Sequence, residues 1–103
     1  MWAQMMTMRL RPGKESELLR VYELLRSAET PGSGLLRSTA MRDDKDPSRI
    51  VHVVIFESEE KARARERDPA RAEVLVKVRD LMAELFEGPP EFADLTVLED
   101  SVP

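Results

Sequence analysis

The sequence contains one histidine, His52, and no cysteine, so few of its side chains can exchange a proton near neutral pH. An imidazole titrates at about 6.5, which suits His52 to act as a general base that takes a proton from a phenolic hydroxyl. The alternative is a neutral, buried histidine whose ring bonds to a backbone carbonyl or to Tyr22. Because no second acid or base stands beside His52, the structural role is favoured over the catalytic one.

Five further side chains are candidates for binding an apolar or aromatic small molecule. Tyr22 could donate its hydroxyl proton to a ligand oxygen, or could pack with that hydroxyl in solvent. Met6 and Met8 carry flexible thioethers that suit a cavity for varied apolar ligands, although ordinary core filling is the simpler explanation. Val54 and Phe56 follow the histidine at even spacing, so in a strand they would share its face.

The composition excludes several classes of chemistry. The absence of cysteine removes disulfides, thiolate metal sites, iron–sulfur clusters and cysteine nucleophiles. The net charge of −4 has the wrong sign for a protein dedicated to nucleic acid or to an anionic membrane, and no apolar run approaches the ~20 residues of a membrane span. We expect one domain, residues 1–103, in a soluble cytoplasmic protein that binds no nucleic acid, membrane, metal or cofactor.

A run of basic residues between positions 61 and 71 is interleaved with glutamates. Glu59 and Arg63 are four positions apart, which is the spacing of a helical ion pair. Because no glycine-rich phosphate loop accompanies the run, we predict a solvent-exposed, salt-bridged surface rather than a phosphate site. The basic residues concerned are Lys61, Arg63, Arg65, Arg67 and Arg71.

The elements that must position these residues begin with four predicted strands. Alternation of apolar and polar residues predicts strands at residues 2–11, 35–42 and 92–99. Residues 50–56 form a nearly continuous β-branched run, which predicts a strand buried on both faces in the middle of a sheet. The histidine would therefore lie on a central strand.

Helices are predicted between the strands. Apolar residues three and four positions apart predict an amphipathic helix from residue 14 to about residue 29. Ser58 can cap a short helix that runs to about residue 67, and Asp68 with Pro69 can start another. The predicted inner stripes are Leu18, Val21, Tyr22, Leu25 and Ala28 in the first helix, and Val74, Val78, Leu81 and Leu85 in the last.

The order of elements, β-α-β-β-α-β, matches the ferredoxin-like α+β unit. In that unit a four-stranded antiparallel sheet carries its helices on one face. The other face would leave Val51, Val53 and Ile55, or the alternate set of the same strand, exposed in a single chain. An apolar face of this kind is usually covered by a partner. We therefore predict a homodimer in which two such faces pack together.

Five short motifs along the chain resemble those of a known family, the antibiotic biosynthesis monooxygenase-like group. Each motif is weak alone, but the five occur in the family's order over nearly the whole chain. The resemblance implies a dimeric α+β barrel with a ligand cavity between the helices and the sheet. The motifs are LRPGKE at 10–15, PGSG at 31–34, DPSRI at 46–50, FESEEKA at 56–62 and RDPAR at 67–71.

The resemblance implies two chemistries, the oxygenation of phenols or quinols without a cofactor and the oxidative breakdown of haem. Haem-degrading members use an asparagine, a tryptophan and a histidine, whose positions correspond here to Met6, Ala64 and Val74. Because Val74 has no lone pair for iron, we expect no haem. Arg71 stands where the oxygenase branch usually has a histidine.

The sequence is compatible with two functions. The first is a cofactor-independent monooxygenase for an aromatic, phenolic or quinol-type small molecule, with His52 as the base. The second is a non-catalytic dimeric module of the same fold that binds or senses a small molecule. His52 favours the enzyme. The absence of a carboxylate and an indole or phenol at Val54 and Phe56, where oxygenases often have them, favours the module.

Overall fold

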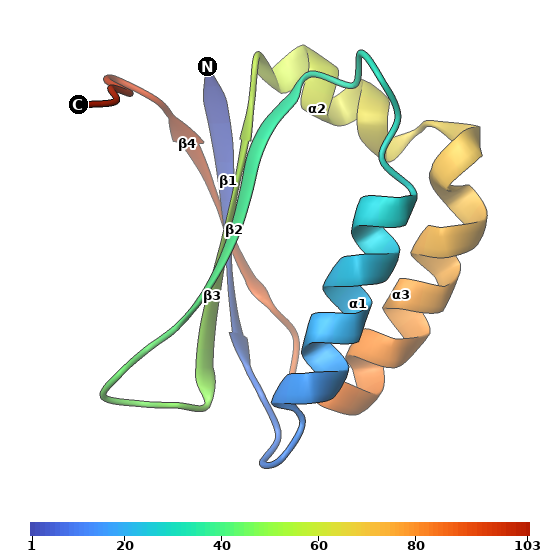
Figure 1. The fold of residues 1–103 in the computed structure, drawn as a ribbon, viewed down its shortest axis with the longest axis vertical. Helices are drawn as coiled ribbons and strands as arrows, with labels where there is room; N and C mark the ends of the chain where they lie inside the picture. Colours follow the sequence, from blue (N-terminus) through green and yellow to red (C-terminus); the bar gives the residue numbers. More distant parts are fainter.

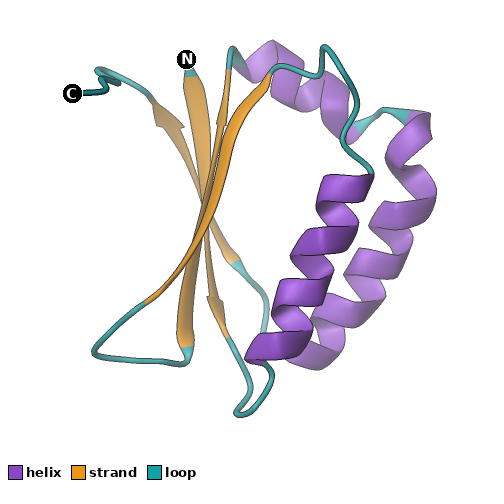
Figure 2. Cartoon of the chain, in the orientation of Figure 1, coloured by secondary structure: helices purple, strands orange, loops and turns teal.

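The chain forms one antiparallel sheet with all of its helices on one side, as Figures 1 and 2 show. The computed structural model describes residues 1–103. The strands are β1 (Trp2–Arg9), β2 (Leu35–Arg42), β3 (Arg49–Phe56) and β4 (Glu91–Thr96). The helices are α1 (Glu15–Ser27), α2 (Glu59–Glu66), the single 3₁₀ turn η1 (Pro69–Arg71) and α3 (Ala72–Leu85).

This architecture confirms the predicted ferredoxin-like fold. The strand order is β2-β3-β1-β4, and all neighbouring strands are antiparallel. β3 lies inside the sheet, between β1 and β2, as its continuous apolar sequence predicts. In this register His52 sits opposite Met6 on β1 and Ala40 on β2.

The chain direction changes between α2 and α3 at a capped break. Ser58 starts α2 by accepting a hydrogen bond from the backbone N–H of Lys61 at 3.2 Å. Asp68 then accepts from the N–H of Ala70 at 2.9 Å, and Pro69 occupies the first position of η1. These are the two caps that the sequence predicts. Because of this break, the residues after Pro69 do not continue the helical periodicity of α2, and their side chains can face a different side.

The hydrophobic core fills only one end of the space between the sheet and the helices. It joins the last part of β1 and the start of β3 to the first turns of α1 and the last turns of α3. Leu81, predicted for the inner stripe, is instead 38% exposed, because the inward face of α3 is set by Val78 and Leu85. The core residues are Met8, Leu10, Leu18, Val21, Ile50, Val78, Leu85 and Phe86.

The opposite face of the sheet has no covering element in this chain, as Figure 2 shows. Val51, Val53 and Ile55 lie on it and are half-buried by their neighbours on adjacent strands, rather than fully exposed as predicted for a single chain. Met41 and Leu95 on the same face are 46% and 41% exposed. The face is therefore apolar and open to a partner. No helix is long and apolar enough to cross a membrane.

Candidate functional site

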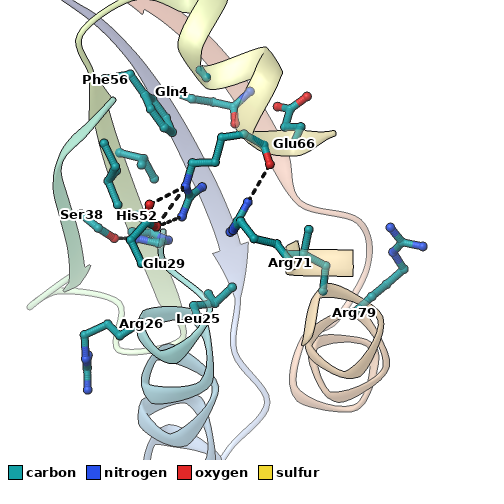
Figure 3. Close-up of a pocket in the computed structure, with 15 residues that line it drawn as sticks. Gln4, Leu25, Arg26, Glu29, Ser38, His52, Phe56, Glu66, Arg71 and Arg79 are labelled. Atoms are coloured by element: carbon teal, nitrogen blue, oxygen red, sulfur yellow. Dashed lines mark hydrogen bonds and ion pairs between the residues drawn. The ribbon is translucent and has the colours of Figure 1, made fainter. Parts of the chain in front are cut away.

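The end of the helix–sheet space that the core leaves unfilled holds a cavity of about 720 Å³. β1, β2 and β3 form one wall, and α1, α2, η1 and α3 contribute the rest (Figure 3). The volume lies in the range of small-molecule sites. Its apolar lining comes from Leu25, Leu35, Val54, Phe56, Ala62 and Leu75.

His52 lies on the sheet wall of this cavity and is only 5% exposed. Its Nε2 lies 2.7 Å from Oγ of Ser38 on the neighbouring strand, within hydrogen-bond distance. The ring of Tyr22 meets the imidazole edge-on, with 5.0 Å between ring centroids. Neither His52 Nδ1 nor the Tyr22 hydroxyl has a hydrogen-bond partner. The expected bond to a backbone carbonyl or to Tyr22 is therefore wrong, and Ser38 takes that role.

The surroundings of His52 keep its imidazole neutral at pH 7. Burial lowers the pKa of His52 below its ordinary value of 6.5, and the positive charge of Arg65 lowers it further. Burial also raises the pKa of Tyr22 to about 12, so the phenol keeps its proton. His52 is thus in the protonation state that a general base needs, whereas Tyr22 can only donate.

The lowered pKa of His52 predicts that the folded protein loses stability in mild acid. Below pH 6.5 the unfolded chain protonates this imidazole before the folded chain does, so the free energy of unfolding falls with falling pH. One such group contributes a slope of at most about 1.4 kcal/mol per pH unit. Urea unfolding of the wild type and of His52→Gln between about pH 5 and 8 measures this contribution as the difference of the two slopes. Equal slopes would contradict it.

A partly buried ion pair lines the cavity that also holds His52. Arg65 of α2 donates from Nε and Nη2 to Oε2 of Glu29 at 3.1 and 2.6 Å. Burial alone would raise the pKa of Glu29, but hydrogen bonds from Arg65 and Ser33 outweigh it and hold this pKa below its ordinary value. The guanidinium also lies over the ring of Phe56, 5.5 Å from its centroid. Arg65 thus joins α2, the end of α1 and the sheet wall at one point.

Arg71 is the second basic residue that turns inward. Its residue surface is 2% exposed, and Nη1 donates to the backbone carbonyl of Arg65 at 3.1 Å. Figure 3 shows Arg71 extending from the helices toward the sheet. The predicted solvent-exposed surface holds for Lys61 and Arg63, which pair with surface carboxylates. It is wrong for Arg65, which α2 brings against Glu29. It is also wrong for Arg71, because the Asp68 cap and Pro69 change the helical phase before it.

The structure brings most, but not all, of the predicted ligand-binding residues together. Val54 and Phe56 line the cavity with His52. Tyr22 lines an adjoining cavity of about 390 Å³, which shares His52 and Ser38 with the first. Met6 and Met8 do not line either cavity: Met8 is a core residue, 4% exposed, and Met6 packs against the same core.

Several lining residues were not predicted as part of a site. Ser38 had no distinguishing sequence signal, because its strand alternates poorly. Glu29 and Gln4 likewise lie in ordinary helix-end and strand contexts. For Arg71 a signal was present in Asp68-Pro69, since a cap and a proline in succession mark a change of helix direction.

The lining residues do not fit a haem group held through an axial ligand. Among them only His52 has a ring nitrogen able to bind iron, and its Nε2 is engaged by Ser38 while its Nδ1 is sealed from solvent. Val74, at the position of the ligand histidine of haem-degrading relatives, is not a lining residue. No group of three His, Asp or Glu side chains is arranged to hold a metal ion.

Fold and cavity together define a ferredoxin-like α+β domain with a small-molecule pocket between its sheet and its helices. The model of the antibiotic biosynthesis monooxygenase family matches residues 1–77, which is about three quarters of the chain. The chain belongs to this family. Comparison with curated proteins gives no match.

Solved structures of similar fold cover essentially the whole chain. A proposed antibiotic biosynthesis monooxygenase from Nitrosomonas europaea is 17% identical, with a TM-score of 0.75, over 96% of this chain and 100% of that one. Rv0793 from Mycobacterium tuberculosis is 15% identical, with a TM-score of 0.71, over 98% of each chain. A mutant of MhuD with two manganese protoporphyrin IX molecules in each active site is 19% identical, with a TM-score of 0.75, over 100% of each chain. At these identities the likeness establishes the fold.

Proposed function

We propose that this protein is a cofactor-independent monooxygenase whose substrate is an electron-rich aromatic small molecule of the phenol or quinol type. The observation that carries the proposal is a single neutral imidazole on the sheet wall of the cavity, on the same strand as the apolar lining residues Val54 and Phe56. Family membership supports a monooxygenase-like activity or small-molecule binding. The aromatic substrate class is supported by the ring of Phe56 and the other apolar residues of the lining.

The proposed role of His52 is to remove the phenolic proton. In the tautomer with its proton on Nδ1, Nε2 accepts a hydrogen bond from the hydroxyl of Ser38, 2.7 Å away. Ser38 belongs to the edge strand β2 and is exposed, so its hydroxyl can accept the substrate proton while passing its own to Nε2. The phenolate that results is electron-rich enough to give an electron to dioxygen, which the neutral phenol is not.

The net reaction balances without a metal or flavin. One phenolic O–H, one ring C–H and one O₂ become the two carbonyl groups of a quinone and one water. The ring loses four electrons, which dioxygen accepts together with the ring proton and the phenolic proton that His52 had taken. Water is released with both protons, so the imidazole is regenerated neutral.

Oxygen uptake tests this proposal directly. Purified protein mixed with polycyclic phenols and quinols is expected to consume one O₂ for each carbonyl product formed. With isotopically labelled dioxygen, one labelled atom should appear in the product and the other in water. Heat-denatured protein serves as the control for autoxidation. Binding of these compounds without oxygen uptake above that control would contradict the proposal.

The second candidate function is a non-catalytic binding module of the same fold. The observation that favours it is the sealed state of His52, since Ser38 engages Nε2 while Nδ1 is cut off from solvent without a partner. In that function His52 and Tyr22 shape the pocket rather than move protons. Because glutamine fills a similar volume, ligand binding would then persist in His52→Gln with an affinity close to that of the wild type.

We further propose that the protein works as a homodimer formed through the open face of the sheet. The apolar side chains of Val51, Val53 and Ile55 lie on this face with partly exposed Met41 and Leu95. No element of the chain covers them (Figure 2). Burying such a face against a second copy removes it from water and supplements the small core of a 103-residue domain.

A further inference from the structure

The residues that line the cavity carry more positive than negative charges. Four arginines and two glutamates line it. One arginine is neutralised inside the cavity, where Arg65 binds Glu29. Glu66, the other glutamate, pairs with Arg63 outside the lining. The lining arginines left without an ion pair are Arg26, Arg71 and Arg79.

Arg71 is the buried member of this set. Its guanidinium makes one hydrogen bond, from Nη1 to the carbonyl oxygen of Arg65, and its Nε is buried with no partner. Burial lowers the pKa of Arg71 and the nearby charge of Arg65 lowers it further, while the charges of Glu29 and Asp68 raise it. A guanidinium stays charged at any physiological pH. Neither carboxylate forms an ion pair with Arg71, so a bound anion would give this buried charge a direct partner.

The unused donors of Arg71 have the geometry that recognises a carboxylate. The bond to Arg65 occupies Nη1 and leaves Nε and Nη2, which form the other edge of the planar group. Two parallel N–H donors on one edge match the two oxygens of a carboxylate. Arg65 uses the same edge to hold the carboxylate of Glu29: Nε and Nη2 both donate to Oε2, at 3.1 and 2.6 Å, and Nε is also 3.4 Å from Oε1. The cavity already contains one carboxylate held by this edge of an arginine.

We propose that the cavity takes an aromatic carboxylic acid, whose carboxylate binds Nε and Nη2 of Arg71. The ring would lie against the apolar lining formed by Val54, Phe56 and Leu75. This inference rests on the proposed function for the aromatic character of the ligand, and it adds the anionic group. Arg71 projects from the helices and His52 lies on the sheet, so a ligand between them would be held at one side and deprotonated at the other.

A matched pair of probes tests the proposal by calorimetry on the purified protein. 1-Naphthoate and 1-naphthamide have the same ring and nearly the same size, but only the first is charged. The acid is expected to bind about 10- to 100-fold more tightly, the range for a charge-assisted bidentate contact. Similar affinities for the two probes, or no binding of either up to their solubility, would overturn the proposal.

Arg71→Gln provides the matched variant. The shorter glutamine keeps a polar amide at this position but loses the charge and the paired donors of the guanidinium edge. The preference for acid over amide should fall to about one, with little change in amide affinity. Arg20→Met removes an equal charge from the exposed face of α1 and should leave the preference intact. An unchanged preference in Arg71→Gln would overturn the assignment of the anion site.

Failure of this inference can be told apart from failure of the proposed oxidation. Naphthoate binding needs no turnover. A preference for the acid that depends on Arg71, without any oxygen uptake, would therefore support the anion site and contradict the oxidation, and the protein would be an anion-binding module. Oxygen uptake with uncharged phenols, combined with equal binding of acid and amide, would support the proposed oxidation and contradict the proposed carboxylate site. If Arg71→Gln fails to fold, Arg71→Lys, which keeps the charge and removes the paired donors, takes its place: the acid–amide ratio should fall, and an unchanged ratio would overturn the assignment to Arg71.

Discussion

Replacing His52 by glutamine is expected to lower kcat for the oxygen-dependent oxidation by about 10²- to 10⁴-fold, which is the usual contribution of a general base. Glutamine fills a similar volume and can still bond to the Ser38 hydroxyl, 2.7 Å from the imidazole in the wild type. It cannot accept a proton. In the wild type the rate should rise with pH through the titration of His52, whose pKa burial holds below 6.5, and then level off. The variant should lose this limb of the profile.

Two neighbouring substitutions separate proton transfer from packing. Ser38→Ala removes the hydroxyl that would relay the proton, so it should lower kcat while leaving the pKa read from the pH profile near that of the wild type. Tyr22→Phe keeps the ring that meets His52 edge-on and removes a hydroxyl without a partner, so its activity should be close to normal. Full turnover in a folded His52→Gln protein would dismiss the general-base mechanism and leave the binding module.

Replacing Val53 by aspartate is expected to convert the dimer into monomers at micromolar concentration. Val53 lies at the centre of the open face, on the interior strand β3. In a symmetric dimer the change places two like charges in an apolar interface. An unpaired buried charge costs several kcal/mol, so the dissociation constant should rise at least about 10²-fold. Light scattering or sedimentation equilibrium reports the change as a halving of the mass.

The same substitution on the helical side of the molecule provides the control. Val76 of α3 is 54% exposed, so Val76→Asp introduces an equal charge away from the sheet and should leave the mass unchanged. A wild-type chain that stays monomeric in these measurements would contradict the dimer. A Val53→Asp protein that remains dimeric would place the interface elsewhere, on another surface of the chain.

The sequence by itself determined the elements, their order and the family. The signals were local: alternation in β1, the β-branched run of β3, the Ser58 cap, and the Asp68 cap with Pro69 before α3. Each depends on residues within a few positions of one another, where backbone geometry and side-chain period act directly. The alternation of β3 also predicted that His52, Val54 and Phe56 would share one face, and all three line the cavity.

Only the tertiary structure decided which polar groups surround His52. Ser38 reaches it because β2 pairs with β3 in one register, with an irregularity between Leu35 and Arg37 that sets which residues face the helices. A slip of one residue would turn Ser38 to the opposite face. The sequence of β2 does not show which of its residues face the helices. The pairing of β2 with β3 determines this.

The inward turn of Arg65 and Arg71 was likewise decided by packing. Along the chain both belong to a run of alternating charges that is typical of a solvated helix surface. In the fold, α2 crosses the end of the sheet and brings Arg65 to Glu29, 36 positions earlier, while the break at Pro69 directs Arg71 into the same space. Whether a charged residue lies at a surface or in a cavity depends on what the neighbouring elements place around it. That arrangement is a property of the assembled layers, because the residues that bury these two arginines are distant in sequence.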